Sequence, residues 1–539
     1  MTGMQHTQPV FLGVDVGTGS ARAGVFSPDG RMLGTGKRDI RIWRDGVRAE
    51  QSSDDIWSAV CAAVRAALIQ AEIPAERVAG IGFDATCSLV ALAADGTPLS
   101  VSASGEPARN IIVWMDQRAG AQAARINATG HRVLDYVGGR ISPEMETPKL
   151  LWLKENLPAQ YAAAGHFLDL TDFLTWRATG DLSRSSCTVT CKWTYLAHAG
   201  GYDASYFHAI GLSDLCDDGF ARIGRDVVTP GTALGRGLTQ DAASALGLPA
   251  GIPVAAGLID AHAGGVGTVG ARGAPAQTRM AYVFGTSACT MTSSARETTV
   301  PGVWGPYHGA MLPDLWLNEG GQSAAGEAIA HLVRMHPHYP ETQQAARGKG
   351  VSVIAYLLAR ASEMIDRPED AGRLAGEMIV VPDFLGNRAP LADPAARAII
   401  AGLDLRADLA SHIALYIAGL TGIGYGLRQI LDAQAACGIA PDTVVVSGGA
   451  GASDLVKQVL ADAAGITMAR PGAAEPVLLG SAMLGAVAGG HFDTLQTAMA
   501  DMSSLDRFYR PASGEIRALH LNRYRRFTAL QRAARGEAG

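Results

Sequence analysis

The chain has 539 residues, more than one hydrophobic core usually serves, so we expect two domains with a cleft between them. Its formal net charge of -6 argues against a nucleic-acid-binding surface, which needs a concentrated basic face. Hydrophobic residues make up 48% and charged residues 18% of the chain, which is typical of a folded globular protein and excludes long disordered stretches.

No targeting or membrane segment is apparent. Residues 1–9 are polar and lack the basic start and apolar core of a signal peptide, and no apolar run reaches the roughly 20 residues of a membrane span. The seven cysteines form no Cys-x-x-Cys pair, which suits a reducing compartment. Cys187 and Cys191 would share a helix face, but no second ligand pair follows, so a structural zinc is disfavoured. We expect a cytoplasmic protein without a membrane partner.

The first predicted element is a β-hairpin at residues 11–26, in which two apolar runs flank Gly17-Thr18-Gly19-Ser20. The turn suits phosphate, because its glycines leave backbone N–H groups uncovered and its hydroxyls add donors. Arg22 adds a positive charge, and Asp15 could hold a divalent cation among phosphate oxygens. On these residues alone, an ordinary turn is an equally good interpretation.

The next segments predict strands alternating with helices. We expect a strand at 32–42, a helix from the Ser-Ser-Asp-Asp run at 52–55 to about residue 71, and a buried strand at 78–83. That strand ends in the polar run 84–88, and another apolar run ends in the polar segment 114–118. Strands that end in polar residues and alternate with helices predict an α/β architecture with ligand sites at the strand ends.

Residues 120–240 are expected to be mostly helical and irregular, with helices at 149–156 and 159–164 and a polar segment at 188–195 that contains Lys192. After this region we expect a regular strand that ends at Asp260, followed directly by the start of a helix rich in small residues. A carboxylate at that junction stays ionised and hydrogen-bonded, so it can accept a proton without being buried and neutralised.

A second hairpin at residues 280–291 repeats the plan of the first, with Gly285-Thr286-Ser287 at its turn. Two such turns in different halves predict a duplicated fold, in which each half offers one hairpin to opposite sides of a shared phosphate chain. The repeat favours the phosphate interpretation over coincidence. Downstream, we expect a loop at 318–326 that opens a helix, a strand and loop at 379–390, and a long buried helix at 409–435.

Near the C-terminus, a strand at 443–447 leads into a glycine-rich loop at 448–453 and a helix at 454–464. This geometry favours a nucleotide, because backbone without side chains can approach a flat ligand closely. The basic and aromatic tail at 507–535 is interpreted as a terminal helix packing on the body, in preference to a nucleic-acid-binding segment.

Other phosphate-binding classes are excluded by missing motifs. No Gly-x-x-x-x-Gly-Lys-[Ser/Thr] occurs, because Gly36-Lys37 and Gly348-Lys349 lack the following Ser or Thr. Neither Asp-Phe-Gly nor His-Arg-Asp of the protein kinases is present. A dinucleotide fingerprint is also absent after the first strand, so an NAD-dependent dehydrogenase loses its main support.

As an ordered set that spans nearly the whole chain, these segments resemble the FGGY carbohydrate kinases. The matching segments are 11–22, Asp260 after its strand, 285–287, 401–405 leading to 411–413, 447–450 and 475–486. The resemblance implies an α/β fold of two actin-like, ribonuclease H-like domains closing over ATP, Mg²⁺ and a polyol or ketose. We expect the domains at 1–280 and 281–539, with the last helix packing back on the first domain, and a homodimer is common in the family.

The resemblance also implies residue roles. Asp260 would take the proton from the substrate hydroxyl that attacks the γ-phosphate, and Asp15 would contact Mg²⁺ through water. The phosphates would lie on Gly17, Thr18, Gly19, Ser20, Arg22, Gly285, Thr286 and Ser287, and adenosine on Gly448, Gly449, Ala450 and Ser453. Ala450 stands where the family has a third glycine and Ser453 where it has asparagine, which leaves the adenosine contacts open.

Three segments, at 82–88, 187–193 and 318–324, resemble ribulokinases, and two more, at 114–118 and 384–390, resemble the D-ribulokinase branch. They imply a sugar site formed by Asp84, Thr86, Cys87, Trp114, Asp116, Lys192, Asp260 and Glu319. We expect phosphorylation of D-ribulose at its 5-hydroxyl. The alternatives are L-ribulose or a pentitol such as ribitol or xylitol as substrate, or a catalytically silent, sugar-binding regulatory protein on the same fold.

Four of these sugar-site residues, and the nearby His262, also have a plain structural interpretation. Lys192 could be a surface lysine and Glu319 a helix cap, although the resemblance favours substrate contacts for both. Cys87 is interpreted as a lining residue, not a nucleophile. Trp114 could stack on a sugar or pack in the core, and His262 could be a packed neighbour of the site or a ligand.

Overall fold

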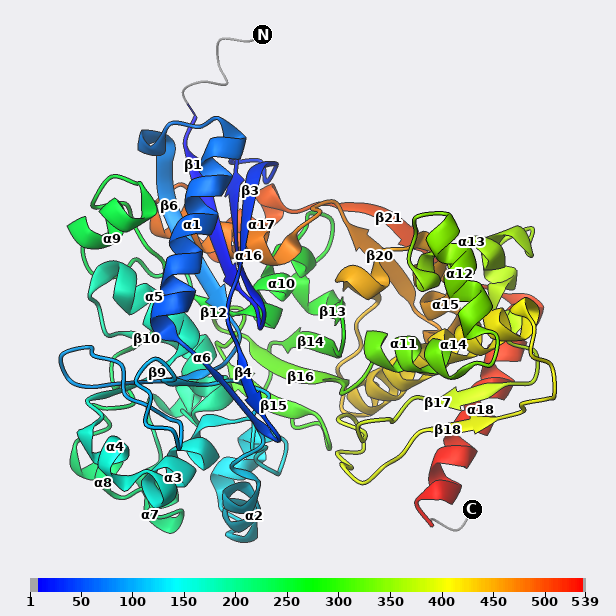
Figure 1. Ribbon diagram of the computed structural model, residues 1–539, viewed down its shortest axis with the longest axis horizontal. Helices are drawn as coiled ribbons and strands as arrows, with labels where there is room; N and C mark the ends of the chain where they lie inside the picture. Colours follow the sequence, from blue (N-terminus) through cyan, green and yellow to red (C-terminus); the bar gives the residue numbers. More distant parts are fainter. Residues whose placement is uncertain (1–7, 537–539) are drawn as a thin grey trace.

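The computed structural model describes residues 8–536. Residues 1–7, which fall in the N-terminal segment examined for a signal peptide, and residues 537–539 lie outside the described part. Figure 1 shows two lobes side by side, with the N-terminal end on one and the C-terminal end on the other. Within residues 8–536, no helix is both long enough and apolar enough to cross a membrane.

The first lobe is built on a five-stranded sheet in the order β12-β6-β1-β2-β3. Its strands are β1 (Val10–Val16), β2 (Ser20–Phe26), β3 (Met32–Asp39), β6 (Val78–Ala85) and β12 (Leu258–Ile259). The central strand β1 is antiparallel to β2 and parallel to β6, with Asp15 opposite Arg22 on one side and Asp84 on the other. Because β12 runs parallel to β6, Asp260 emerges at the same edge as these residues.

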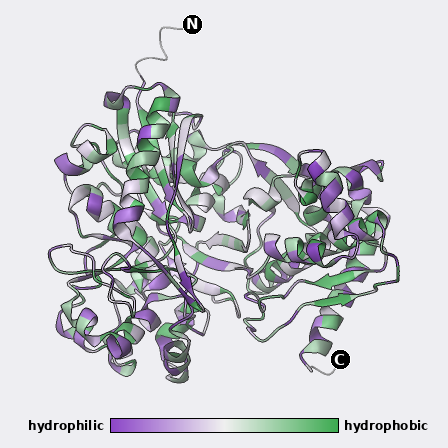
Figure 2. Ribbon diagram, viewed as in Figure 1, coloured by the Kyte–Doolittle hydropathy of each residue, from purple (hydrophilic) through white to green (hydrophobic). Residues whose placement is uncertain are grey.

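Helices cover both faces of this sheet. Helix α1 (Ser53–Ala71) begins at Ser52, whose side chain accepts the N–H of Asp55, and it packs on β2 and β3. Helix α16 (Pro476–Ala488), far away in sequence, packs on β1 and β6, with α10 (Asp260–Val269) and α17 (Leu495–Met502) beside it. Figure 2 shows that hydrophobic residues are frequent in the strands and the inner helices of both lobes.

Glycines bring α10 and α16 into backbone contact. A Cβ atom at Gly267 would lie 2.0 Å from the carbonyl oxygen of Pro476, and one at Gly480 would lie 2.0 Å from that of Ala263. Any side chain at either position would therefore separate the two helices. The position of Asp260, the first residue of α10, depends on this close approach.

The second lobe repeats the plan of the first. Its sheet has the order β15-β16-β14-β13-β19-β20-β21, and β13 is antiparallel to β14 and parallel to β19, as β1 is to β2 and β6. The strands are β13 (Arg279–Phe284), β14 (Ala288–Ser294), β15 (Trp304–His308), β16 (Trp316–Gln322), β19 (Thr443–Ser447), β20 (Thr467–Pro471) and β21 (Leu505–Tyr509). The long helix α14 (Leu409–Ala436) and α15 (Asp454–Ala464) pack together in this lobe. The expected duplication and the α/β fold class are confirmed.

Further elements extend both lobes. In the first lobe, another five-stranded sheet contains β4 (Trp43–Asp45), β5 (Arg48–Gln51), β7 (Leu89–Leu92), β8 (Ile111–Ile112) and β9 (His166–Asp169). Its other elements are α2 (Gly120–Ala128), α3 (Glu146–Asn156), α4 (Pro158–Ala163), α5 (Leu170–Thr179), α6 (Ser186–Lys192), α7 (Ala204–Ala209), α8 (Asp214–Asp217), α9 (Gln240–Leu246), β10 (Arg184–Ser185) and β11 (Val227–Val228). The second lobe adds α11 (Gly326–Met335), α12 (Tyr339–Gly348), α13 (Val353–Glu363), β17 (Ile379–Val381), β18 (Ile399–Ala401) and α18 (Gly514–Ala534).

Two expectations differ from the structure. Residues 318–322 belong to strand β16, not to a loop, because β14 and β15 hydrogen-bond to it on both sides. The polar segment around Lys192 is helix α6, with Ser185 accepting the N–H of Cys187 at its start, which agrees with the mostly helical region expected there. The C-terminal helix α18 packs on α14, α15 and β17 of the second lobe, and not back on the first, because Phe527 contacts Tyr425 of α14. The domain boundary at residue 280 stays a prediction.

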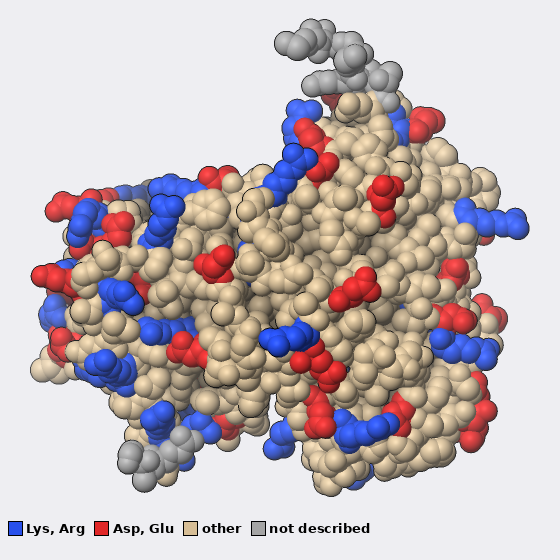
Figure 3. All heavy atoms as spheres, turned by 180° about the vertical axis from the view of Figure 1, so that it is seen from behind, with Lys and Arg blue, Asp and Glu red and all other residues tan. Residues whose placement is uncertain are grey.

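The charged side chains show no single-sign field on the face in Figure 3, where acidic and basic residues alternate over both lobes. The basic tail forms α18 and is tied to its own lobe: Arg523 donates to the carbonyl oxygen of Gly372, and Tyr524 donates to Asp432 at 2.8 Å. The tail therefore packs on the body, as the sequence indicated.

Candidate active site

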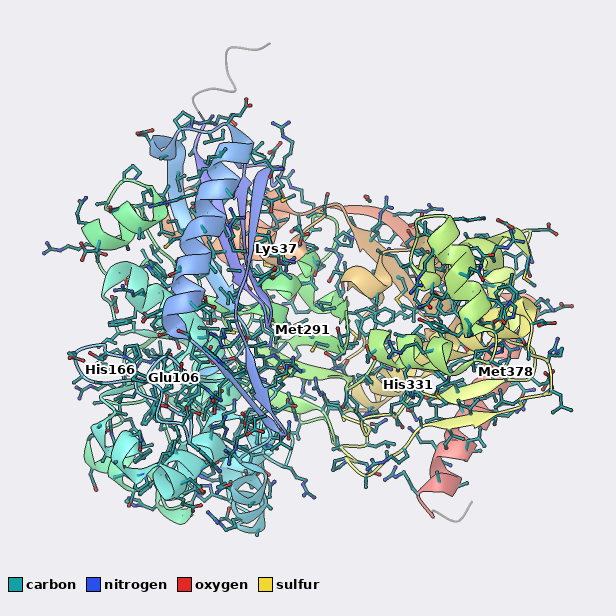
Figure 4. All side chains as sticks on the ribbon, in the orientation of Figure 1. Lys37, Glu106, His166, Met291, His331 and Met378 are labelled. Carbon is teal, nitrogen blue, oxygen red and sulfur yellow. The ribbon has the colours of Figure 1, made fainter. Side chains whose placement is uncertain are left out.

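A cavity of about 370 Å³ lies where the two hairpins face each other. Strand β14, whose Met291 is labelled in Figure 4, runs through the region where the lobes meet. Both lobes contribute to the wall: the lining residues are Asp15, Gly17, Thr18, Arg22, Thr86, Cys87, Trp114, Glu144, Lys192, Ile259, Asp260, Ala261, Val283, Gly285, Thr286, Ser287, Cys289, Trp304, Glu319, Arg388 and Val477. The fold thus brings most of the predicted site residues together.

The first hairpin is a tight turn closed by a hydrogen bond from the N–H of Gly17 to the carbonyl oxygen of Ser20, at 3.1 Å. Trp114 donates its indole N–H to the Thr18 hydroxyl at 3.0 Å, so the Trp114 ring braces the turn. Arg22 is engaged on both sides, with its Nε 2.7 Å from Asp15 Oδ2 and its Nη1 2.7 Å from Glu475 Oε2. Arg22 therefore links β1 and β2 to the start of α16, besides placing a positive charge at the cavity.

The second hairpin is closed in the same way, with the N–H of Gly285 donating to the carbonyl oxygen of Ser287 at 2.9 Å. The carbonyl oxygen of Thr286 accepts the N–H groups of Ala325 and Glu327, so the start of α11 is tied to this turn. The glycine loop after β19 packs behind it: a Cβ atom at Gly448 would lie 2.5 Å from the carbonyl oxygen of Phe284.

The predicted adenosine residues Gly448, Gly449, Ala450 and Ser453 are not among the residues that line this cavity. Their adenosine contacts stay a prediction. Gly19 and Ser20 likewise lie at the first turn without lining the cavity.

Three aspartates converge below the first hairpin. Asp84 is fully buried and accepts a hydrogen bond from Ser481 of α16. Burial, reinforced by the nearby charge of Asp15, raises the pKa of Asp84 well above its usual value. Asp84 does not line the cavity, so it acts behind the wall, not in direct contact with a ligand.

Asp260 lines the cavity at the first residue of α10, where its Oδ1 accepts its neighbour's backbone N–H at 2.7 Å. Loss of solvent, together with the charge of Asp15, raises the pKa of Asp260 to about 6. The sequence predicted a carboxylate that is neither buried nor neutralised. In the structure Asp260 is half-buried, and its pKa of about 6 leaves it mostly ionised at neutral pH, although the surrounding protein removes much of its water.

A second charged group lies deeper in the cavity. Lys192 Nζ lies 3.9 Å from Glu319 Oε2 and 4.7 Å from the centre of the Trp304 ring. Burial by itself would raise the pKa of Glu319, but the charges of Lys192 and His262 lower it to about 2. Both side chains are therefore charged and nearly buried, and neither is the surface lysine or helix cap of the plain interpretation.

His262 holds this group from behind. Its Nε2 lies 3.4 Å from Glu319 Oε2, and its Nδ1 lies 3.0 Å from Cys187 Sγ. Among residues 8–536, one set of buried groups is compact enough to surround a metal ion: Cys191, His262 and Glu319. The Lys192 ammonium, 3.9 Å from Glu319, opposes a cation there. This cluster shares Cys191 with the pair Cys187 and Cys191 considered in the sequence, and adds His262 and Glu319 from other segments; the absence of a structural zinc stays a prediction.

Asp116, predicted to touch the sugar, is fully buried away from the cavity. Its Oδ2 lies 2.8 Å from Arg118 and accepts the N–H of Ala49 at 2.7 Å. Glu50 completes the ion pairs of Arg118, so this aspartate orders β5 and the segment after β8. Thr86 and Cys87 do line the cavity, and burial raises the pKa of the Cys87 thiol, which favours a lining residue over a nucleophile.

Eight lining residues were not predicted as site residues. Four of them have polar, thiol or aromatic side chains: Glu144, Cys289, Trp304 and Arg388; the other four, Ile259, Ala261, Val283 and Val477, are apolar. Cys289 belongs to the second hairpin and Arg388 to the segment 384–390 of the family resemblance, whereas Glu144 and Trp304 lie in no pattern that indicates a site. The four residues with polar, thiol or aromatic side chains come from four separate segments, and only the packing of the lobes brings them together.

The chain is similar to known carbohydrate kinases in sequence and in structure. The family model described as "FGGY family of carbohydrate kinases, N-terminal domain" matches residues 10–267, and the corresponding C-terminal model matches residues 280–489. An FGGY carbohydrate kinase domain-containing protein of Homo sapiens is 45% identical over 520 residues, which cover 94% of each chain. A D-ribulokinase of Saccharomyces cerevisiae is 36% identical, covering 92% of this chain and 75% of that protein. The crystal structure of a xylulose kinase from Rhodospirillum rubrum superposes with a TM-score of 0.77 at 21% identity, covering 97% of this chain and 98% of the other.

Proposed function

The chain belongs to the FGGY family of carbohydrate kinases, and we propose that it transfers the γ-phosphate of ATP to the 5-hydroxyl of D-ribulose. One observation carries the proposal: Asp260, poised to take a proton, lies in one cavity with two phosphate-type hairpins and the charged pair Lys192–Glu319. The D-ribulokinase relative, 36% identical over most of this chain, supports the choice of sugar.

The charged pair supplies the means to hold a sugar. A hydroxyl group is both donor and acceptor, so it can accept from Lys192 and donate to Glu319 across their 3.9 Å separation. Trp304 offers an apolar face beside them. These contacts would orient the sugar and exclude water from the reacting end.

Asp260 would then take the proton of the attacking hydroxyl. Its pKa of about 6 leaves it ionised at neutral pH and close enough to neutrality to accept a proton as the new bond forms. Phosphoryl transfer passes through a loose transition state, so most of the rate comes from positioning and from neutralising charge. The N–H groups and hydroxyls of the turns at 17–20 and 285–287 would hold the phosphate oxygens.

The cavity fits a magnesium ion bound with ATP. Asp15 and Asp260 both line it, and Asp84 lies close behind, so oxygen ligands gather where Arg22 and Lys192 are the neighbouring cations. Oxygen ligands are those Mg²⁺ prefers. Asp15 would hold the ion through water, and the ion would neutralise charge on the phosphates.

The test is a screen of ADP release with Mg-ATP and D-ribulose, L-ribulose, D-xylulose, ribitol and xylitol. We expect the highest kcat/KM with D-ribulose. A clear preference for another sugar or polyol would change the assigned substrate but leave the assignment as a kinase in place. No turnover with any of them, combined with measurable sugar binding by calorimetry, would favour the alternative of a silent sugar-binding protein.

A further inference from the structure

The cavity contains a second charged pair with the same unusual spacing. Arg388 Nη2 lies 3.9 Å from Glu144 Oε2, which equals the separation of Lys192 and Glu319. Both separations are too long for a direct hydrogen bond, although the side chains are largely buried. A direct pair is the usual way to stabilise two opposite charges away from water, so the gap itself needs an explanation.

The guanidinium of Arg388 is unsatisfied toward the cavity. Only 16% of its side chain is exposed, and within residues 8–536 its N–H groups donate no hydrogen bond. The guanidinium also lies over the Trp304 ring, whose centre is 5.4 Å from Arg388 Cζ. Five donors in a fixed fork next to an open space require acceptors from outside the protein.

Hydrogen bonds fix the loop that carries Arg388. Arg388 follows Asn387, whose backbone exchanges two hydrogen bonds of 2.8 Å with Asp393 and whose side chain donates to Asp383. Gln531 of α18 donates to the other oxygen of Asp383 at 2.9 Å. The loop between β17 and β18 is thus anchored to the C-terminal helix.

Glu144 is anchored from the other lobe. Its Oε1 accepts from Gln117, and its backbone N–H donates to Ser142. Its second carboxylate oxygen, Oε2, is the atom that faces Arg388 in the cavity wall. The pair therefore spans the two lobes, with one member fixed to each.

The two gaps have the size of a bridging hydroxyl. An oxygen that lies to the side of the line joining two atoms 3.9 Å apart can be about 2.8 Å from each of them, and it can accept from the cation while it donates to the carboxylate. In both pairs a cation is matched by a carboxylate, so this part of the cavity suits a neutral polyhydroxyl compound and not an anionic one, whereas the phosphates of ATP would lie at the two hairpin turns.

From this geometry we infer that Arg388 and Glu144 form a second hydroxyl-binding pair, which selects substrates with a hydroxyl at the end remote from the phosphorylated one. The inference rests on the proposed function, because it needs a polyhydroxyl ligand in the cavity. Arg388 and Lys192 contact the same ring, since the centre of Trp304 lies 5.4 Å from Arg388 Cζ and 4.7 Å from Lys192 Nζ. The second pair therefore extends the wall on which the first pair would hold the sugar.

The experiment compares wild type, Arg388→Met and Arg388→Lys with D-ribulose and 1-deoxy-D-ribulose. Hydrogen bonds to charged groups suggest that Arg388→Met raises the KM and the calorimetric Kd for D-ribulose roughly 10- to 100-fold. The KM for ATP should not change, and Arg388→Lys should recover part of the affinity. Wild type should bind 1-deoxy-D-ribulose more weakly than D-ribulose by a similar factor. The Arg388→Met variant should bind the two sugars equally well, because the contact to the missing hydroxyl is already absent in that variant.

Arg397→Met is the matched control, because Arg397 is an exposed arginine of the same loop that donates to the loop backbone. The inference would be overturned if Arg388→Met and Arg397→Met lost the same affinity for D-ribulose. It would also be overturned if removing the hydroxyl weakened binding to Arg388→Met as much as it weakens binding to wild type. Wild type that binds D-ribulose without phosphorylating it would refute D-ribulose as the phosphorylated substrate but leave the binding comparison intact. Wild type that binds no sugar or pentitol would refute both.

Discussion

Asp260 combines two properties that usually oppose each other. As the first residue of α10, it lies at the positive end of a helix and accepts a backbone hydrogen bond, both of which favour the charged carboxylate. Desolvation and the charge of Asp15 outweigh them and raise its pKa to about 6. The carboxylate is therefore charged at neutral pH, but its pKa is close enough to neutral pH that protonation costs little free energy, as a proton acceptor requires.

Replacing Asp260 by Asn should abolish phosphoryl transfer while the sugar still binds, because the amide keeps the size of the side chain but cannot take a proton. We expect kcat to fall by at least roughly 100-fold, with the calorimetric Kd for D-ribulose changed by less than about threefold. Turnover within a few-fold of wild type would show that another group is the base.

The pH dependence follows from the same pKa. Since only the ionised form accepts a proton, log kcat/KM for the sugar should fall with unit slope below pH about 6. The Asp260→Asn variant should lose that limb from any residual activity. A limb unchanged in the variant would assign it to another group.

The stability of the fold should change with pH in the opposite direction to kcat/KM. The folded-state pKa of about 6 lies above the unfolded value of about 3.9, so the folded protein holds a proton that the unfolded chain releases between these pH values. Unfolding free energy therefore falls as pH rises through this window. We expect Asp260→Asn to stabilise the fold by about 1–3 kcal/mol at pH 7 and by almost nothing at pH 4.

Denaturant unfolding at the two pH values measures this difference. Asp39→Asn, at the exposed end of β3, is the control. Equal stabilisation by Asp260→Asn at both pH values would show that ionisation is not its cause.

At the scale of elements, the contact between α10 and α16 sets the geometry of the site. These helices come from residues far apart in sequence, and their backbones touch at Gly267 and Gly480. The contact holds α10 against the sheet that carries Asp15, while Arg22 joins that sheet to Glu475 at the start of α16. The position of Asp260 relative to the first hairpin is thus a property of two crossing helices.

Gly267→Ala should therefore be destabilising, although alanine is the better helix former. The new methyl group would lie 2.0 Å from the Pro476 carbonyl oxygen, so the helices must move apart, at a cost of about 2–4 kcal/mol. We also expect a fall in kcat, because α10 carries Asp260. Thermal unfolding and steady-state kinetics measure the two effects.

Gly348→Ala is the matched control, since Gly348 lies in α12 and a methyl group there would meet nothing within 4 Å. It should be neutral or stabilise by about 0.5–1 kcal/mol. If the two alanine variants behaved alike, the close helix contact would not be what the fold needs at Gly267.

At the scale of the molecule, the cavity belongs to both lobes. Asp15 and Lys192 come from the first lobe, whereas Glu319 and Arg388 come from the second. A ligand that bridges Lys192 to Glu319 and Glu144 to Arg388 would draw the lobes together.

Small-angle scattering should therefore show a smaller radius of gyration with D-ribulose plus a non-hydrolysable ATP analogue than without ligands. Sugar alone should produce part of the change, and Arg388→Met should reduce that part. An unchanged radius of gyration under saturating ligand would count against closure. The same data would test the predicted dimer through the scattering mass.

Much of the fold could be predicted from the sequence, because local patterns carry it. The two hairpins, helix α1 with its serine cap, the long helix α14, and the strand, glycine loop and helix from β19 to α15 are all visible as apolar periodicity and turn residues. The repeat of the hairpin also indicated the duplicated architecture. Residues 318–322 were missed as a strand, since their glycines and polar residues are held by pairing with β14 and β15, which no local pattern shows.

For the site, the sequence by itself determined the residues attached to recognisable turns and strand ends: Asp15, the two hairpin turns and Asp260. Only the tertiary structure decided that Asp84 and Asp116 lie behind the wall, that Arg22 is paired with Asp15 and Glu475, and that Glu144, Trp304 and Arg388 join the cavity. The physical reason is that a turn's donors and a strand's polar end are local properties of the chain. Desolvation and the 3.9 Å gaps between charges arise only when segments more than one hundred residues apart pack together.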